Sequence, residues 1–329
     1  MKGLGGMKGI LTSFILLTGI ASCSRSDAVW ERASVSGPRM KVEFAMVFDA
    51  AHERIVAFGG RDKNFDGVDE TWVYDCKTHT WANAHPASSP PYRSSLAMTY
   101  DPVRKKVLMF GGDNFERAFN DLWEYDSGLN TWTELSPSNP PDARQMHGMT
   151  YDANRNVVLM FGGRRTGGGA QFKDTWEYRS ATNSWRSLDP VHSPPAQDHT
   201  KIAYDPRSKR PILFTGAIGH NTASVGTWAY ENGDWKKLDI GVSPTGGHAS
   251  FVYDGKIGKL ILIGHAEESD MTDTWMFDGV GEEWTRLSAS GRPPLREHFG
   301  LTYDELHDTF ILVGGFPNSD NWQMKLRPS

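Results

Sequence analysis

The chain has 329 residues, of which 38% are hydrophobic and 12 are tryptophans, enough for the interior of one domain of about 300 residues. Its formal net charge at pH 7 is −5. Nucleic-acid phosphates require a basic face, so this charge argues against a nucleic-acid partner.

The N-terminal segment has the features of a secretory signal peptide over residues 1–22. Basic Lys2 and Lys8 precede a mostly apolar stretch that is too short to span a bilayer as a helix. The stretch ends in Ile20-Ala21-Ser22-Cys23, which resembles the lipobox of bacterial lipoproteins.

That resemblance implies that Cys23 becomes the lipidated first residue of the mature chain and that residues 23–28 form a short tether. We therefore expect an exported bacterial lipoprotein, anchored in a membrane and facing the periplasm or the cell surface. The alternative is an ordinary signal peptide with a chance cysteine.

Trp30 is the first mark of the folded domain. It lies 28 residues before Phe58. Each of five later tryptophans likewise lies 28 or 29 residues before an apolar residue at a position equivalent to Phe58. These residues are the anchors of a repeat, each directly before a glycine position, and they are spaced 49 to 53 residues apart. A period near fifty residues fits a four-stranded propeller blade and is too long for helical solenoids. The six anchors are Phe58, Phe110, Phe161, Phe214, Ile263 and Val313.

The third repeat illustrates the four strands expected in each blade. Strand a ends at Tyr151-Asp152, strand b runs over Val157 to Phe161, strand c contains Trp176, and strand d contains Trp185. Short β-branched and aromatic runs bounded by Gly, Asn, Asp and Pro are typical of such strands. The sequence therefore predicts an all-β protein.

This layout resembles the kelch family, whose marks are a double glycine after a hydrophobic strand and a spaced Tyr and Trp. The glycine pairs stand at Gly59-Gly60, Gly111-Gly112, Gly162-Gly163 and Gly314-Gly315. Blades four and five depart from the pattern, with Thr215-Gly216 and Gly264-His265. The resemblance implies a six-bladed β-propeller over residues 29–329.

The two ends of the chain are predicted to share the sixth blade. Trp30 marks a strand d without a blade of its own, whereas the last repeat supplies three strands, around Gly300 to Tyr303, Thr309 to Val313 and Trp322. One N-terminal and three C-terminal strands then close the ring and remove its open edges.

Cys76 is predicted in the turn between strands c and d of the first blade. If Cys23 is lipidated, Cys76 has no partner for an intramolecular disulfide. Copper radical oxidases resemble kelch rings but need a cysteine crosslinked to a tyrosine beside histidine ligands. A lone thiol in a peripheral turn excludes that activity.

Arginines recur after the proline-rich loops between strands d and a. Arg93, Arg144 and Arg296 each stand eight residues before the Asp that ends strand a. A ring of guanidinium groups at the channel mouth would suit a carboxylate or phosphate ligand. A residue repeated at one place in several blades also suits packing and hydrogen bonding, and we favour this structural interpretation.

Histidines occupy nearby positions. His199, His248 and His298 stand six residues before their strand-ending Asp, and His147 stands five before. Three imidazoles could converge on a metal ion. We expect the blades to be too far apart for one ion to reach all three, and we expect hydrogen bonds at blade junctions instead. The carboxylates two residues before a Trp belong to the same structural set: Glu70, Asp121, Asp174, Asp273 and Asp320.

The loops between strands b and c differ from blade to blade, so we expect specificity there. In the first loop Asp62, Asn64 and Asp66 match the start of a calcium loop, although Val73 replaces the distal glutamate. A solvated acidic turn is the alternative, and no other cofactor is expected. The third loop carries Arg164 and Arg165 as basic candidates for ligand binding.

Two functions follow. The first is a monomeric, membrane-tethered binding or scaffold module that holds a protein or glycan on its loop face. The alternative is a periplasmic carbohydrate-processing enzyme, because the sequence looks like the six-bladed kelch proteins that include sialic-acid mutarotases. Arg144 or Arg296 would then bind a sugar carboxylate, and Glu297 or His147 would move the proton.

Overall fold

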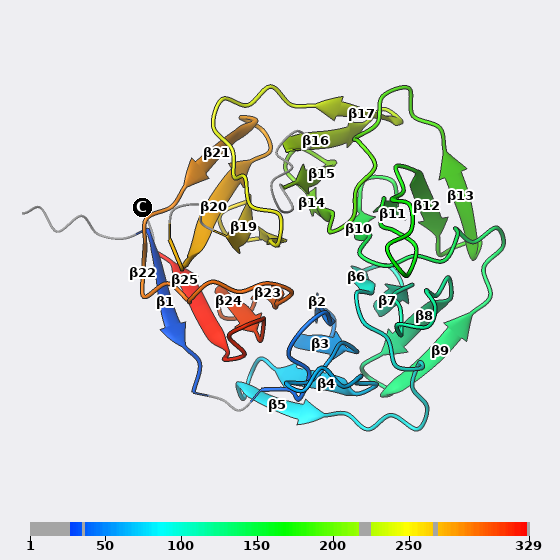
Figure 1. Cartoon of the computed structure of the whole chain (residues 1–329), viewed down its shortest axis with the longest axis horizontal. Coiled ribbons are helices and arrows are strands. Elements are labelled where there is room, and N and C mark those ends of the chain that lie inside the picture. Colours follow the sequence, from blue (N-terminus) through cyan, green and yellow to red (C-terminus); the bar gives the residue numbers. More distant parts are fainter. Residues whose placement is uncertain (1–26, 35–36, 217–224, 266–268, 328–329) are drawn as a thin grey trace, which may run out of the picture.

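Six β-sheets surround a central channel in the computed structural model (Figure 1). The structure describes residues 27–34, 37–216, 225–265 and 269–327. Within these ranges every regular element is a strand, and each sheet is a blade whose first strand lies nearest the channel (Figure 1). The predicted six-bladed propeller with four strands per blade is confirmed.

Five blades are built from consecutive strands, in the order a, b, c and d from the channel outward. The first three blades contain β2 (Ala45–Asp49), β3 (Arg54–Phe58), β4 (Thr71–Asp75) and β5 (Thr80–Asn83); β6 (Ala97–Asp101), β7 (Lys106–Phe110), β8 (Leu122–Asp126) and β9 (Thr131–Leu135); and β10 (Gly148–Asp152), β11 (Val157–Phe161), β12 (Thr175–Arg179) and β13 (Ser184–Leu188). The fourth and fifth contain β14 (Lys201–Asp205), β15 (Arg210–Thr215), β16 (Gly226–Glu231) and β17 (Asp234–Lys237); and β18 (Ser250–Asp254), β19 (Lys259–His265), β20 (Thr272–Asp278) and β21 (Glu283–Arg286).

The sixth blade joins the two ends of the chain as predicted. It contains β23 (Gly300–Asp304), β24 (Thr309–Val313) and β25 (Trp322–Leu326), and β1 (Ala28–Arg32) pairs antiparallel with β25 as strand d. A two-residue strand that the sequence did not predict, β22 (Ala289–Ser290), pairs parallel with the outer side of β1. The N-terminal strand is therefore held on both edges (Figure 1).

The core lies between neighbouring blades. All five residues of β11 are buried, and so are all five of β24, as expected for a strand covered on both faces. On strand d, a tryptophan indole packs between blades and donates from Nε1 to a threonine hydroxyl on strand c of the preceding blade. These pairs are Trp132–Thr71, Trp235–Thr175, Trp284–Thr227 and Trp30–Thr274.

Cys76 is fully buried in the turn between β4 and β5, as predicted. Burial raises the pKa of its thiol well above the usual range, so the thiol stays protonated at neutral pH. It is the one cysteine among the described residues.

Candidate functional site on the loop face

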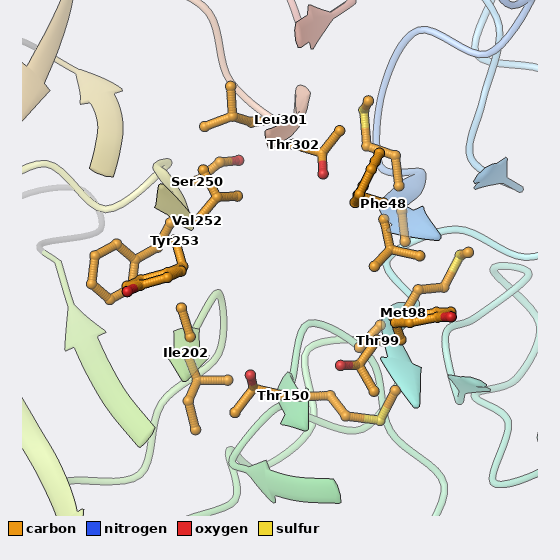
Figure 2. Close-up of a pocket in the computed structure, with 18 of the residues that line it drawn as sticks. Phe48, Met98, Thr99, Thr150, Ile202, Ser250, Val252, Tyr253, Leu301 and Thr302 are labelled. Carbon is orange, nitrogen blue, oxygen red and sulfur yellow. The ribbon is translucent and has the colours of Figure 1, made fainter. Parts of the chain in front are cut away.

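The connections from strand d to strand a and from strand b to strand c share one face of the ring, which we call the loop face. The central channel opens there and has a cavity volume of about 480 Å³. Its wall comes from strand a of each blade and is lined by residues such as Phe48, Met98, Thr150, Val252 and Thr302 (Figure 2). Apolar groups and hydroxyls therefore dominate the channel wall.

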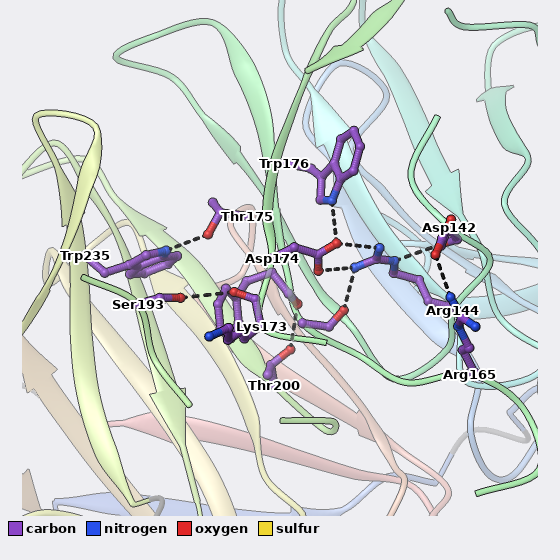
Figure 3. Close-up of polar contacts among 12 residues, drawn as sticks. Asp142, Arg144, Arg165, Lys173, Asp174, Thr175, Trp176, Ser193, Thr200 and Trp235 are labelled. Atoms are coloured by element: carbon purple, nitrogen blue, oxygen red, sulfur yellow. Dashed lines mark hydrogen bonds and ion pairs between the residues drawn. The ribbon is translucent and has the colours of Figure 1, made fainter. Parts of the chain in front are cut away.

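The ring of arginines that was considered as a ligand site from the sequence does not line this channel. The side chains of Arg93, Arg144 and Arg296 are fully buried within their own blades. The Nη1 and Nη2 groups of Arg144 donate to the two carboxylate oxygens of Asp174 at 2.7 and 2.8 Å, and Nη1 also donates to the Gly162 carbonyl at 3.0 Å (Figure 3).

The other two blades repeat this arrangement. Arg93 forms the same bidentate pair with Asp121, and Arg296 donates to the carboxylate and the carbonyl of Asp320. Hydrogen bonds and charge from the arginines lower the pKa of these carboxyls despite their burial. The structure therefore supports the structural interpretation, because the guanidinium donors are already used inside the blades.

The carboxylates are further fixed by the tryptophans that follow them. The indole Nε1 of Trp176 donates to Asp174 at 2.7 Å, and Trp123 and Trp72 do the same to Asp121 and Glu70. Asp273 is paired instead with Arg286 and Arg292. These contacts agree with the structural role that the sequence predicted for these carboxylates.

His147 and Glu297, the proton-transfer candidates of the alternative enzyme, lie in different environments. His147 is buried, packs edge-on against Phe110, and has no hydrogen-bond partner at either ring nitrogen. Burial and the nearby Arg144 lower its pKa to about 3. Glu297 has a side chain that is 41% exposed, and its carboxylate lies 4.0 Å from Nε2 of His248.

The two basic candidates of the third loop are also separated. Arg164 lies 3.3 Å from the carboxylate of Asp198 and is half-buried. Arg165 pairs with Asp142 at 2.8 Å, and both side chains are more than 60% exposed. Arg165 is therefore available to a ligand at the surface, whereas Arg164 is paired with the buried carboxylate of Asp198.

Asp62 builds a turn. Its Oδ1 accepts hydrogen bonds from the backbone N–H groups of Asn64 at 2.8 Å and Asp66 at 3.1 Å, and its Oδ2 pairs with Arg39 at 3.2 Å. The Asp62 side chain is buried, and these hydrogen bonds lower the pKa of its carboxyl against the effect of desolvation. The carboxylate is thus engaged by the chain itself, and calcium binding by Asp62, Asn64 and Asp66 stays a prediction.

This turn presents an aromatic side chain that sequence reasoning missed. Phe65 is 48% exposed and contacts Phe316 of the sixth blade, with ring centroids 5.6 Å apart. Phe115 of the second blade is 54% exposed and lies 6.5 Å from the ring of Tyr92. Gly67, two residues after Phe65, lies against Tyr92, because a Cβ placed on it would lie 2.3 Å from the Tyr92 ring.

We call Phe65, Tyr92, Phe115 and Phe316 the aromatic patch. Phe65 and Phe115 have φ angles of 66° and 70°, a left-handed conformation that is strained for bulky side chains. The guanidinium of Arg61 stacks 3.7 Å above the Phe115 ring. The patch spans the loops of blades six, one and two.

The three histidines converge, contrary to the expectation from the sequence. One nitrogen from each of His199, His248 and His298 lies within 4.8 Å of the others. Their ring centroids are 4.8 to 5.4 Å apart. The expected separation was wrong because these residues precede strand a and point across the narrow channel mouth.

Several predictions concern segments outside the described residues. They include the signal peptide over residues 1–22, the lipidated Cys23 and most of the tether. The loops that follow Thr215-Gly216 and Gly264-His265 are also described only in part. Across the described ranges, the chain has no helix with the length and apolar character needed to cross a bilayer.

The comparisons with known proteins agree with the propeller fold. The family model described as the KLHDC2/KLHL20/DRC7 Kelch-repeats domain matches residues 21–216 and 136–315. A curated relative, the N-(sulfonatooxy)prop-2-enimidothioate sulfolyase of Thlaspi arvense, is 32% identical over 162 residues, which are 47% of this chain and 45% of that protein. Adagio-like protein 3 of Oryza sativa subsp. japonica is 23% identical over 321 residues, which are 90% of this chain and 49% of that protein.

This chain therefore matches about half the length of each of these relatives. The family match is broader, because its two segments together run from residue 21 to residue 315 and pass through all six blades. Kelch propellers serve in general as protein-binding scaffolds, which agrees with the rigid ring and its varied loops. The chain belongs to the kelch-repeat family of β-propellers.

Proposed function

We propose that this protein is a monomeric protein-binding module that uses the aromatic patch on its loop face and is tethered to a membrane through a lipid on Cys23. The observation that supports this most directly is the exposure of Phe65, Phe115 and Phe316 on loops of three adjacent blades. Exposed aromatic clusters on rigid scaffolds are typical centres of protein interfaces.

The geometry of the aromatic patch favours a role in binding a partner. Phenylalanine in a left-handed turn costs folding free energy, and the chain bears this cost at both Phe65 and Phe115. Hydrogen bonds hold each turn: Asp62 accepts from two backbone N–H groups, and Asn114 accepts from those of Glu116 and Arg117. Rigid aromatic anchors lose little conformational entropy on binding.

Site-specific photo-crosslinking in intact cells tests the interface. A photoreactive phenylalanine analogue at position 65 or 115 should give a discrete protein adduct. The same analogue at Leu129 or Val280, two exposed residues in turns on the opposite face, should give none. An adduct pattern that is equal on both faces would contradict the proposal.

A second variant keeps the test specific. Phe316→Ala removes the ring that packs on Phe65 and should reduce crosslinking from position 65 while the melting temperature stays close to wild type. A glycan ligand is the other occupant considered from the sequence. It would give no protein adduct, and saccharide binding would instead depend on Phe65 and Phe115.

The tether is tested separately. Metabolic labelling with a clickable fatty acid should modify the wild-type chain and fail to modify a Cys23→Ser variant, which should also leave the membrane fraction. Labelling that persists in the variant would contradict lipidation at Cys23 without affecting the interface. The enzymatic alternative is less favoured, because Arg144 and Arg296 are buried and already paired with Asp174 and Asp320.

A further inference from the structure

Three histidines from consecutive blades meet at the loop-face mouth of the channel. His199, His248 and His298 stand at the same place in the fourth, fifth and sixth blades, directly before strand a. The corresponding residues of the other blades are Glu43, Ser95 and Met146, so half of the mouth is imidazole.

The backbone around the mouth differs between the two halves. The N–H of Glu43 donates to the His298 carbonyl at 3.0 Å, that of Ser95 to Glu43 at 2.7 Å and that of Met146 to Ser95 at 2.8 Å. In the described part of the chain, no such bond links Met146 to His199, His199 to His248 or His248 to His298. The histidine half is therefore less constrained by its own backbone.

The imidazoles also leave ring nitrogens without partners. Nδ1 of His199 pairs with Asp198 at 3.1 Å, which leaves Nε2, and this atom is buried without a hydrogen bond. Nδ1 of His248 is likewise buried without a partner. A carboxylate that holds one nitrogen of a histidine and directs the other inward is typical of metal sites.

We propose that His199, His248 and His298 bind one divalent transition metal ion, best represented by Zn²⁺, at the loop-face mouth of the channel. In a tetrahedral Zn²⁺ site with bonds of about 2.0–2.1 Å, ligand nitrogens lie roughly 3.3 Å apart. The present separation of at most 4.8 Å requires only a small closing movement of the three rings. Three histidines leave a fourth position open to water or to a ligand in the channel.

The surroundings are compatible with a cation. Asp198, Glu297 and Glu43 supply negative charge close to the imidazoles, against the positive charge of Lys201, Arg61 and Arg164. Burial, the other two histidines and the positive charges of Lys201 and Arg61 lower the pKa of His298 to about 3, and burial lowers that of His248. Both rings are therefore neutral at pH 7, the state in which imidazole ligates a metal.

A second histidine group provides the matched control. His79, Asp304 and His307 also have ligand atoms within 4.8 Å of one another. There, however, His79 is paired with the Tyr74 hydroxyl at 3.0 Å and His307 with Asp304 at 3.0 Å. Neither ring has a nitrogen that is buried without a hydrogen-bond partner, unlike His199 and His248, so the proposal places the metal at the channel mouth and not at this group.

The test is metal titration of the purified, chelator-treated chain at pH 7.5. Calorimetry with Zn²⁺ should show one equivalent bound, and Co²⁺ should give the intense visible absorption of a low-coordinate nitrogen site. His248→Ala should weaken Zn²⁺ binding at least 100-fold, and Asp198→Asn should weaken it about 10–100-fold through the orientation of His199.

The control variant His79→Ala/His307→Ala should still bind one equivalent of Zn²⁺ and should keep the Co²⁺ spectrum. Circular dichroism and the metal-free melting temperature identify any variant that fails to fold, and His298→Asn then replaces it. The proposal is overturned if wild type binds Zn²⁺ no more tightly than about 100 μM. It is equally overturned if His248→Ala and His298→Asn both keep wild-type affinity.

Discussion

The indole Nε1 of Trp30 donates to the hydroxyl of Thr274 at 3.4 Å and joins two residues that are 244 positions apart. The same contact links strand d to strand c of the preceding blade at three other junctions, including Trp235 to Thr175 at 2.9 Å. At the junction between the second and third blades, Leu122 occupies the threonine position, and the buried Trp185 Nε1 has no partner. The seam of the ring is thus closed by the device used between internal blades.

Thr175→Val tests this device. The substitution preserves shape but leaves the buried Trp235 N–H without an acceptor, which should lower the free energy of unfolding by about 1–3 kcal/mol. Thr133→Val, at an exposed position of β9, should change it by less than about 0.5 kcal/mol. Urea denaturation measures both, and equal effects of the two substitutions would exclude the hydrogen bond as a source of stability.

The six-bladed ring could be predicted because recurring residues mark where each repeat begins and ends. Six anchors at a near-constant spacing fix the number of blades, and the position of Trp30 before Phe58 fixes how the ring closes. The two-residue β22 could not be predicted, because so short a segment carries no hydrophobic pattern and depends on pairing with β1.

The candidate site was less predictable, since it depends on distances between blades and on backbone angles. Spacing along the chain places the three histidines at equivalent positions but does not give the width of the channel mouth. The exposure of Phe65 and Phe115 follows from left-handed turns, whereas a phenylalanine in sequence is ordinarily assigned to the core. The repeated arginines, Arg93, Arg144 and Arg296, form buried ion pairs within their blades and therefore inform about stability and not about the binding site.

Arg144→Ala should be among the most destabilising single substitutions in the protein. It leaves the Asp174 carboxylate without its partner in a mostly buried setting, which typically costs about 3–5 kcal/mol. Arg144→Lys should recover only part of the loss, because an ammonium cannot make the bidentate pair.

Arg165→Ala is the matched control in the same blade, since its partner Asp142 is solvent-exposed. We expect a change within about 0.5 kcal/mol. Chemical denaturation of the three variants measures the difference. If Arg144→Ala is as stable as Arg165→Ala, the buried pair does not stabilise the blade.

Stability should fall as the pH falls below 6.5, partly because of His147. Its pKa is about 3 in the folded protein, below the roughly 6.5 of an unfolded chain, so the unfolded state takes up a proton first. Stability is then complete above pH 6.5 and is progressively lost toward pH 3. His147→Leu should reduce the slope by up to about 1.4 kcal/mol per pH unit.

The measurement is the free energy of unfolding from pH 7.5 to pH 4.5 in the presence of a chelator, so that metal binding does not contribute. His298 and His248 have lowered pKa values for the same reason and keep part of the slope in the variant. Identical slopes for wild type and His147→Leu would show that His147 is protonated equally in both states.

Asp62 distinguishes a hydrogen-bonded turn from a calcium ligand. In Asp62→Asn the amide oxygen can still accept from the N–H groups of Asn64 and Asp66, so the turn and the presentation of Phe65 should persist. In Asp62→Ala the acceptor is lost, and crosslinking from a photoreactive analogue at position 65 should fall severalfold. Calcium ligation through the carboxylate predicts instead that both variants fail, because both remove the charge that hard Ca²⁺ requires. Asp66→Ala, which changes an exposed side chain of the same loop, should keep wild-type crosslinking if the turn is held by Asp62 alone.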